Sequence, residues 1–119
     1  ANWLFNNIVM KNLDAQFSAI ADPHRRTILT RLARGEATVS ELQSPLGISQ
    51  PAVSRHLRLL EKAGLIEQSR AAQARPRRLK PEGLEAARNW LDELRNLWND
   101  SFDRLDAFLA DPTTETRDD

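Results

Sequence analysis

A tight turn at Gly47 separates two short helical segments in the middle of the chain, and this feature restricts the fold more than any other. Before the turn, Thr38 and Glu41 have the spacing of a capping box, which predicts a helix over about 39–46. After the turn, Ser49 is a good N-cap residue for a second helix. Two short helices joined by a turn that contains glycine form a helix-turn-helix.

The second helix, residues 50–63, has two different faces. At about 100° per residue, Val53, Leu57 and Leu60 fall together and should face the core. The opposite face is polar and cationic, and its side chains suit the major groove of DNA, because arginine bonds guanine and glutamine bonds adenine. A face that is merely solvated is the alternative. The candidate groove residues are Ser49, Gln50, Ser54, Arg55 and Arg58.

Further helices are predicted on both sides of this motif. A helix over about 23–34 should have Pro23 at its first position and should end at Gly35, in a left-handed C-cap. The spacing of apolar residues predicts two more helices, at about 3–20 and 82–109. The last of these has so broad an apolar face that it needs more than one partner surface.

Between the second helix of the motif and the last helix, short alternating runs replace the helical pattern. They predict two antiparallel strands at about 65–70 and 76–80, joined by a basic loop. A disordered basic loop over the whole stretch is the alternative. The length of the chain suits one ordinary domain, which we expect over residues 1–110, followed by a disordered tail at 111–119.

The net charge is zero, yet the charges are divided along the chain. Residues 24–80 hold twelve Arg and Lys against four acids, which gives +8. Residues 81–119 hold four Arg against eleven acids, which gives −7. A basic middle of this kind suggests a polyanionic partner. The alternative is that the charges are divided by chance and the basic surface has no polyanionic partner.

Three segments resemble the ArsR-type (arsenic-repressor-like) regulators, over about residues 14–109: ADPHRRTILTRL, TVSELQSPLGISQPAVSRHLRLLEKAGLI and QARPRRLKPEGL. The resemblance implies a mainly α fold, a winged helix-turn-helix with a two-stranded β-hairpin wing and long terminal helices that form a homodimer. It also implies a repressor that binds double-stranded operator DNA, with helix 50–63 in the major groove and the wing along the backbone or minor groove.

The resemblance also assigns residues to the wing and to the dimer interface. Phosphate contacts give affinity and salt dependence without sequence preference, and the wing residues expected to make them are Arg70, Arg75, Arg77 and Arg78. The dimer interface is expected to contain Leu4, Ile8, Leu91, Leu94, Trp98 and Leu105. An unknown small molecule or partner protein could act as an effector between the dimer helices.

No metal site, cofactor or catalytic centre is predicted. The chain has no cysteine and its last helix has no histidine, so it resembles the ArsR-type members without metal-binding cysteines. His24 and His56 are better explained as ordinary helix residues than as DNA contacts, and their roles stay open. Neither a nucleophile motif nor a glycine-rich phosphate loop appears, which argues against an enzyme.

Together these features predict a sequence-specific, DNA-binding transcriptional regulator. We expect it to bind a two-fold operator as a homodimer, most simply as a repressor and possibly of its own promoter. No signal peptide or membrane-length apolar stretch is seen, so a cytoplasmic protein without membrane contact is expected. A dimeric protein-interaction module that has lost DNA binding is the alternative.

Overall fold

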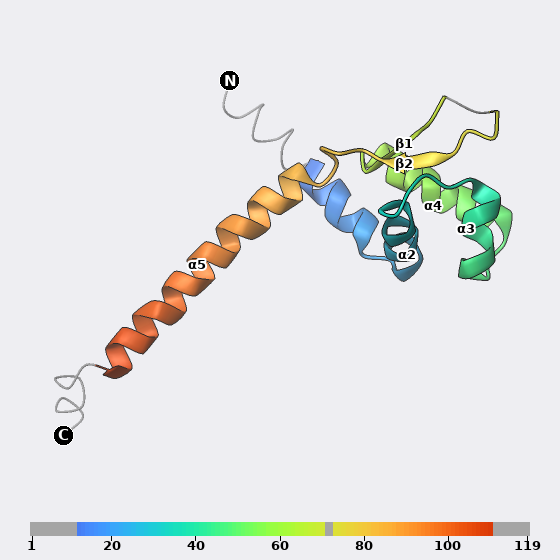
Figure 1. Ribbon diagram of the computed structural model, residues 1–119. Coiled ribbons are helices and arrows are strands. Elements are labelled where there is room, and N and C mark those ends of the chain that lie inside the picture. Colours follow the sequence, from blue (N-terminus) through green and yellow to red (C-terminus); the bar gives the residue numbers. More distant parts are fainter. Residues whose placement is uncertain (1–11, 71–72, 111–119) are drawn as a thin grey trace. The chain divides into compact units, whose positions relative to one another are not determined.

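The chain divides into two compact units. A computed structural model (Figure 1) describes residues 12–70 and 73–110. The first unit spans residues 1–87 and the second spans 88–119. The sequence predicts a single domain over residues 1–110, and the boundary between the two units falls inside that range.

The predicted first helix, at 3–20, is described only in part. Its described residues, 12–20, are helical. Leu4 and Ile8 lie outside the described residues, and so does the predicted tail at 111–119. Their roles therefore stay predictions.

The described secondary structure is mainly helical and contains one antiparallel hairpin. After the first helix come α2 (Pro23–Leu32), α3 (Val39–Leu46), α4 (Gln50–Lys62), β1 (Ile66–Gln68), β2 (Arg77–Leu79) and α5 (Glu85–Ala110). In the hairpin, Ile66 lies opposite Leu79 and Gln68 lies opposite Arg77. The mainly helical fold with a two-stranded hairpin is confirmed, although both strands are shorter than predicted.

The turn between α3 and α4 forms as its sequence predicts. The Thr38 hydroxyl accepts a hydrogen bond from the Glu41 backbone N–H, and the Glu41 carboxylate accepts one from the Thr38 backbone N–H, which completes the capping box. Gly47 ends α3 in the left-handed region, at φ 65°. The Ser49 hydroxyl then accepts from the Ala52 backbone N–H and begins α4.

The end of α2 differs from the prediction. The helix ends at Leu32, and its C-cap is Ala33 in the right-handed helical region. The backbone N–H groups of Arg34 and Gly35 then donate to carbonyls only three residues back, which tightens the last turn and satisfies its carbonyls. Gly35 has φ 145°, outside the left-handed helical region, so the predicted left-handed C-cap is wrong.

The last helix begins at Glu85, later than the predicted start at 82. A turn precedes it because the chain passes very close to the end of α4 here. A Cβ atom at Gly83 would lie 2.8 Å from the carbonyl oxygen of Gly64 and 3.0 Å from the Cα atom of Leu65. Only glycine fits this approach without a shift of backbone.

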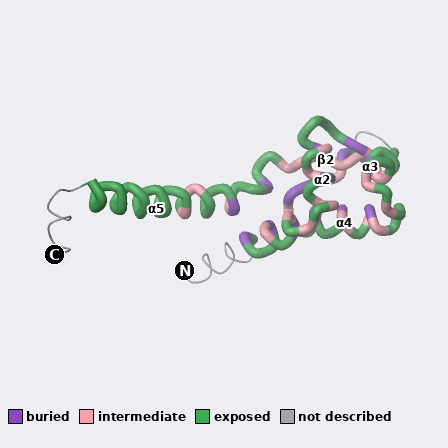
Figure 2. The backbone as a smooth tube through the Cα atoms, turned by 90° about the horizontal axis from the view of Figure 1, so that it is seen from below, coloured by how far each residue is buried: buried purple, intermediate pink, exposed green. Residues whose placement is uncertain are grey.

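The hydrophobic core lies between α2, α3, α4 and the hairpin. Figure 2 shows buried stretches in this part of the chain. Its fully buried large side chains are Ile28, Leu42, Val53, Leu57, Leu60 and Ile66. Burial of these side chains therefore holds the helix-turn-helix in place.

One arginine joins the first helix to α2 and α4. Arg25, on α2, donates from Nε to the carbonyl oxygen of Ala19 at 2.6 Å and from Nη2 to that of Ser18 at 3.1 Å. These two carbonyls belong to the last turn of helix 12–20, and that of Ser18 also accepts the backbone N–H of Ala21 at 3.2 Å. The Nη1 atom of Arg25 lies 3.3 Å from Nδ1 of His56, on α4.

His56 is held neutral at this junction. A guanidinium can only donate hydrogen bonds, so Nδ1 of His56 must accept, which places the ring proton on Nε2. Burial lowers the pKa of His56 below its ordinary value of 6.5; Asp22 opposes this, and the charges of Arg25 and His24 add to it. The ring is half-buried, and its hydrogen-bond partner is Arg25.

The lowered pKa makes the stability of the fold depend on pH. The unfolded chain takes up the imidazole proton more readily than the folded chain, so the contribution of His56 is present above pH 6.5 and is lost as the pH falls through the lower folded-state pKa. We expect the free energy of unfolding to fall more steeply between about pH 7 and pH 5 in the native protein than in His56→Gln. Urea denaturation across this range measures both, and parallel curves would contradict the assignment.

Candidate nucleic-acid interface

The polar face of α4 is turned outward because the apolar face is completely buried. Val53, Leu57 and Leu60 each have 0% of their surface exposed. A rotation of the helix that hid its cations would bring these three side chains into water. Of the predicted groove residues, Ser54 is half-buried and the rest are exposed: Ser49, Gln50, Arg55 and Arg58. Four of the five predicted groove residues are thus open to solvent, and their contact with DNA stays a prediction.

The cations of this face have no acidic neighbour that neutralises them. Arg55, Arg58 and Lys62 form no ion pair with any residue in the described ranges 12–70 and 73–110. Lys62 was not among the predicted contacts, although its spacing of four residues from Arg58 places it on the same face. The outer side of α4 is therefore a row of unpaired positive charge.

Ser49, at the start of α4, can form one hydrogen bond within the protein and a second one outside it. Its hydroxyl oxygen accepts the Ala52 backbone N–H at 3.2 Å, which caps α4. A serine hydroxyl also carries one donor, so the O–H group can still donate to an acceptor outside the protein. The exposed position of Ser49 beside Gln50 makes such an acceptor accessible.

Arg77 serves the fold of the wing. Its Nε donates to Oε1 of Glu61, at the end of α4, over 2.8 Å, and only 15% and 26% of the two side chains are exposed. Its Nη1 donates to the carbonyl oxygen of Arg75. The guanidinium of Arg77 is thus turned toward α4, which favours a positioning role over the phosphate contact that the sequence predicts.

The other wing arginines are more accessible. Arg78 is half exposed and pairs with Glu67 across the hairpin, at 3.0 Å. Arg70 and Arg75 are exposed and form no ion pair within the described parts of the chain. The backbone of Arg75 has φ 46°, a left-handed conformation that ends the loop before β2. Among the four predicted wing residues, Arg70 and Arg75 are the two with unpaired charge.

A third segment supports the wing from its other edge. The backbone N–H of Arg77 donates to the carbonyl oxygen of Ala37 at 2.8 Å, and the N–H of Ala37 donates back at 3.1 Å. Ala37 is fully buried. The hairpin is thereby fixed to the start of α3, and sequence reasoning missed this bridge because a single paired residue has no periodic pattern.

The second unit presents an exposed apolar stripe. Its helix, α5, is exposed over most of its length (Figure 2). The predicted interface residues of α5 follow a three-four spacing along one side: Leu91, Leu94, Trp98 and Leu105. The ring of Phe102, which sequence reasoning left out of the interface, lies 6.4 Å from that of Trp98 and extends the stripe. Single exposed apolar residues are normal, but a continuous row on one helix indicates a contact surface.

The described ranges offer no metal site. Within 12–70 and 73–110, no group of three His, Asp or Glu side chains is placed to hold a metal ion. His24 and His56 do approach each other, with ring centroids 5.6 Å apart, and Asp22 lies near them only as the N-cap of α2. None of the described helices is long and apolar enough to cross a membrane.

Known proteins are similar to this chain in sequence. A family model described as a helix-turn-helix domain matches residues 20–69, which hold α2, α3, α4 and β1. The HTH-type transcriptional regulator Rv2034 of Mycobacterium tuberculosis is 44% identical over 79 residues, which are 66% of this chain and 74% of that protein. The transcriptional repressor SdpR of Bacillus subtilis is 36% identical over 75 residues, 63% of this chain and 83% of that protein.

Solved structures share the fold as well. The solution structure of a homodimeric winged helix-turn-helix DNA-binding domain from Mycobacterium bovis has a TM-score of 0.61, at 24% identity over 77% of this chain and 87% of that one. This likeness shows the winged helix-turn-helix fold. The crystal structure of an ArsR family transcriptional regulator has a TM-score of 0.66, at 40% identity, and covers 75% of this chain and 92% of that one. The chain belongs to the ArsR family of helix-turn-helix transcriptional regulators.

Proposed function

We propose that this regulator binds double-stranded DNA sequence-specifically as a homodimer, at a two-fold operator, and acts as a repressor of transcription in the cytoplasm. The observation that carries the proposal is the row of unpaired cations on the outer face of α4, opposite its fully buried inner face. An α-helix fits the major groove, and a cationic face lowers the cost of approach to phosphates.

Within the groove, the length and chemistry of each side chain on or next to α4 determine which DNA group it contacts. Arg55 and Arg58 have guanidinium groups that bond the O6 and N7 atoms of guanine, and Gln50 has the amide that suits adenine. Ser49 and Ser54 have short hydroxyls that suit nearby phosphates or base edges. Lys62, in the last turn of α4, is a flexible point charge and suits a phosphate.

The wing supplies contacts without sequence preference. Arg70 and Arg75 are exposed and unpaired within the described residues, so they lose little when they bind phosphate. Arg78 must share its charge with Glu67. Arg77 orients β2 on α4 through Glu61 and holds the other arginines in place.

The homodimer supplies the two-fold symmetry. We infer that the apolar stripe of α5, with Leu91, Leu94, Trp98 and Leu105, packs against the same stripe of a second copy. An isologous contact of this kind buries one surface on both subunits. The two α4 helices would then meet half-sites about one DNA turn apart, roughly 34 Å. The relative named as a repressor and the homodimeric structural neighbour support this arrangement.

Selection of bound duplexes from a random-sequence pool tests the proposal as a whole. Sequence-specific binding by a homodimer should enrich an inverted repeat whose half-site centres lie about 10 base pairs, or a multiple of that, apart. The duplex upstream of the gene that encodes the chain should contain it if the repressor acts on its own promoter. A pool that stays random after several rounds would contradict sequence-specific binding.

Arg55→Ala tests base recognition with the selected duplex. Loss of a bidentate contact to guanine should weaken binding to this duplex by about 1–3 kcal/mol and binding to a scrambled duplex by much less. Arg88→Ala removes an exposed cation from α5 and should leave both affinities unchanged. Fluorescence anisotropy gives the affinities of the native protein and the two variants for each duplex. An equal loss of affinity for the two duplexes in Arg55→Ala would remove Arg55 from the base-reading set.

Arg75 and Arg77 of the wing should have different effects on the salt dependence of DNA binding. Arg75→Gln removes an unpaired charge, so the slope of log affinity against log salt should become shallower by about one. Arg77→Gln should leave the slope nearly unchanged and should instead lower the free energy of unfolding, because it breaks the half-buried ion pair with Glu61. The reverse pattern would show that Arg77 meets the phosphate.

Trp98→Glu tests the dimer stripe. A carboxylate in the middle of the apolar stripe should be too costly to bury. The dissociation constant of the dimer should therefore rise at least about tenfold. Asn96→Glu places the same charge on the opposite side of α5 and should leave the dimer intact. Sedimentation velocity over a concentration series compares them, and a Trp98→Glu protein that sediments like the native dimer would contradict the proposed interface.

A further inference from the structure

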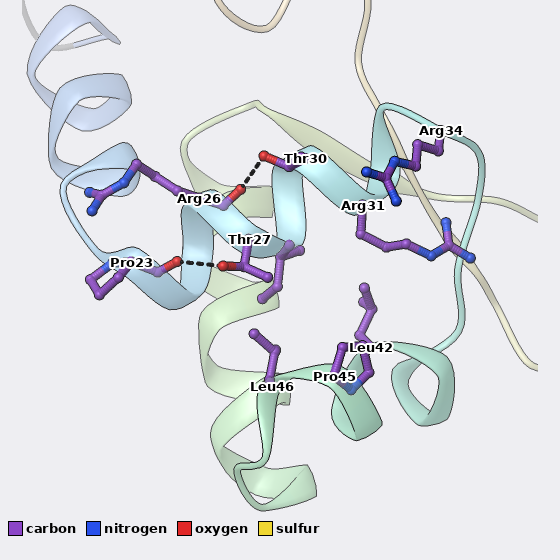
Figure 3. A pocket seen from close by; sticks show the side chains of 10 residues that line it. Pro23, Arg26, Thr27, Thr30, Arg31, Arg34, Leu42, Pro45 and Leu46 are labelled. Atoms are coloured by element: carbon purple, nitrogen blue, oxygen red, sulfur yellow. Dashed lines mark hydrogen bonds between the residues drawn. The ribbon is translucent and has the colours of Figure 1, made fainter.

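A cavity between α2 and α3 is unused by the proposed DNA contacts. Its volume is ≈ 530 Å³, within the range of small-molecule sites. Figure 3 shows side chains of α2 on one side of it and those of α3 on the other. Leu42, Pro45 and Leu46 of α3 form an apolar floor, and buried Ile28 adds to it from α2.

One end of the cavity is cationic. Arg31 and Arg34 line it there. Arg31 donates to the carbonyl oxygen of Gly35 at 2.9 Å, and its Nη2 lies 3.7 Å from the exposed carboxylate of Glu41. Arg34 forms no ion pair with any described residue, so the carboxylate of Glu41 offsets the charge of Arg31 alone.

The remaining polar groups of the lining are already engaged. The hydroxyls of Thr27 and Thr30 donate to backbone carbonyls one turn back on α2, at 3.0 and 2.9 Å. Arg26, at the other end, donates to the carbonyl oxygen of Ile20, and Figure 3 shows its side chain turned away from α3. The unused donors of the cavity are therefore concentrated at Arg31 and Arg34.

We propose that this cavity binds a small organic anion with an apolar body. Its carboxylate or similar group would lie against Arg31 and Arg34, and its hydrocarbon or aromatic part would cover Pro45 and Leu46, above the buried Leu42. A charge-assisted, forked contact from a guanidinium suits a carboxylate, and apolar contact supplies the rest of the affinity. The site is distinct from the outer face of α4, and the proposal does not rest on DNA binding.

The chemistry of the floor separates this ligand class from two other anions. A nucleic-acid phosphate would use the arginines and leave the apolar floor in water. An acidic peptide would bring backbone N–H and C=O groups onto Leu42, Pro45 and Leu46, which have no partners for them. An anion with one charged end and an apolar body satisfies both parts of the cavity.

A titration followed by amide NMR signals tests the proposal, with octanoate as the probe. Octanoate should shift the signals of Thr27, Thr30, Leu42 and Leu46 in a saturable way. Acetate lacks the apolar body and 1-octanol lacks the charge, so each should bind at least about fivefold more weakly. Equal affinity for octanoate and 1-octanol would overturn the anionic part of the site. Shifts confined to the α5 stripe around Trp98 would overturn the site altogether.

Substitution of the arginines locates the charge contact. Arg34→Gln should weaken octanoate binding by about fivefold, and Arg31→Gln by a similar factor. Arg104→Gln removes an exposed cation from α5 and should have no effect. Unchanged affinity in an Arg31→Gln, Arg34→Gln double variant that keeps its thermal unfolding midpoint would overturn the proposal. A hexaglutamate peptide that shifts the same signals at lower concentration would make the cavity a peptide site and would overturn it too.

Discussion

Burial of the inner face of α4 sets the orientation on which the candidate interface depends. Val53, Leu57 and Leu60 are fully buried, and each such side chain contributes about 1.5–3 kcal/mol relative to exposure. An exposed ion pair is worth about 0–1 kcal/mol. No exposed ion pair can therefore stabilise a rotation of α4 that turns its cations inward and exposes these three apolar side chains. The outward row of Arg55, Arg58 and Lys62 follows from apolar packing and needs no attraction of its own.

The basic middle of the chain contains two kinds of arginine. Arg25 caps carbonyls at the end of the first helix and bonds His56, and Arg77 pairs with Glu61 between the wing and α4. These two hold the helix-turn-helix and the hairpin in their positions. Arg55 and Arg58 belong to the other kind, exposed and without an ion pair in the described residues. The charge of +8 over residues 24–80 therefore overstates what is available to a polyanion.

Local signals in the sequence predict the helix-turn-helix well. The capping box at Thr38 and Glu41, the end of α3 at Gly47 and the cap at Ser49 are each decided within a few residues, and all three form as predicted. The periodicity of α4 likewise identifies its buried face. These features need no knowledge of distant contacts, which is why sequence reasoning finds them.

Contacts between distant segments were beyond such reasoning. A long arginine can reach carbonyls, a carboxylate or water, and only the packed fold decides that Arg77 meets Glu61. The bridge between Ala37 and Arg77 and the close approach at Gly83 also join segments far apart in sequence. The delayed start of α5 follows from that approach. Membership in the ArsR family adds the regulatory role, and the roles of single residues remain proposals.

The most direct measurement is fluorescence anisotropy of a labelled random-sequence duplex over a series of salt concentrations. It compares the native protein with a triple variant in which Arg55, Arg58 and Lys62 are changed to Gln. The account predicts that the logarithm of the native affinity falls linearly with the logarithm of the salt concentration. The triple variant should bind more weakly, and its slope should be shallower by about two to three. Native protein that fails to bind at about 20 mM salt, or a triple variant that binds like the native protein, would contradict the claim that this face meets DNA.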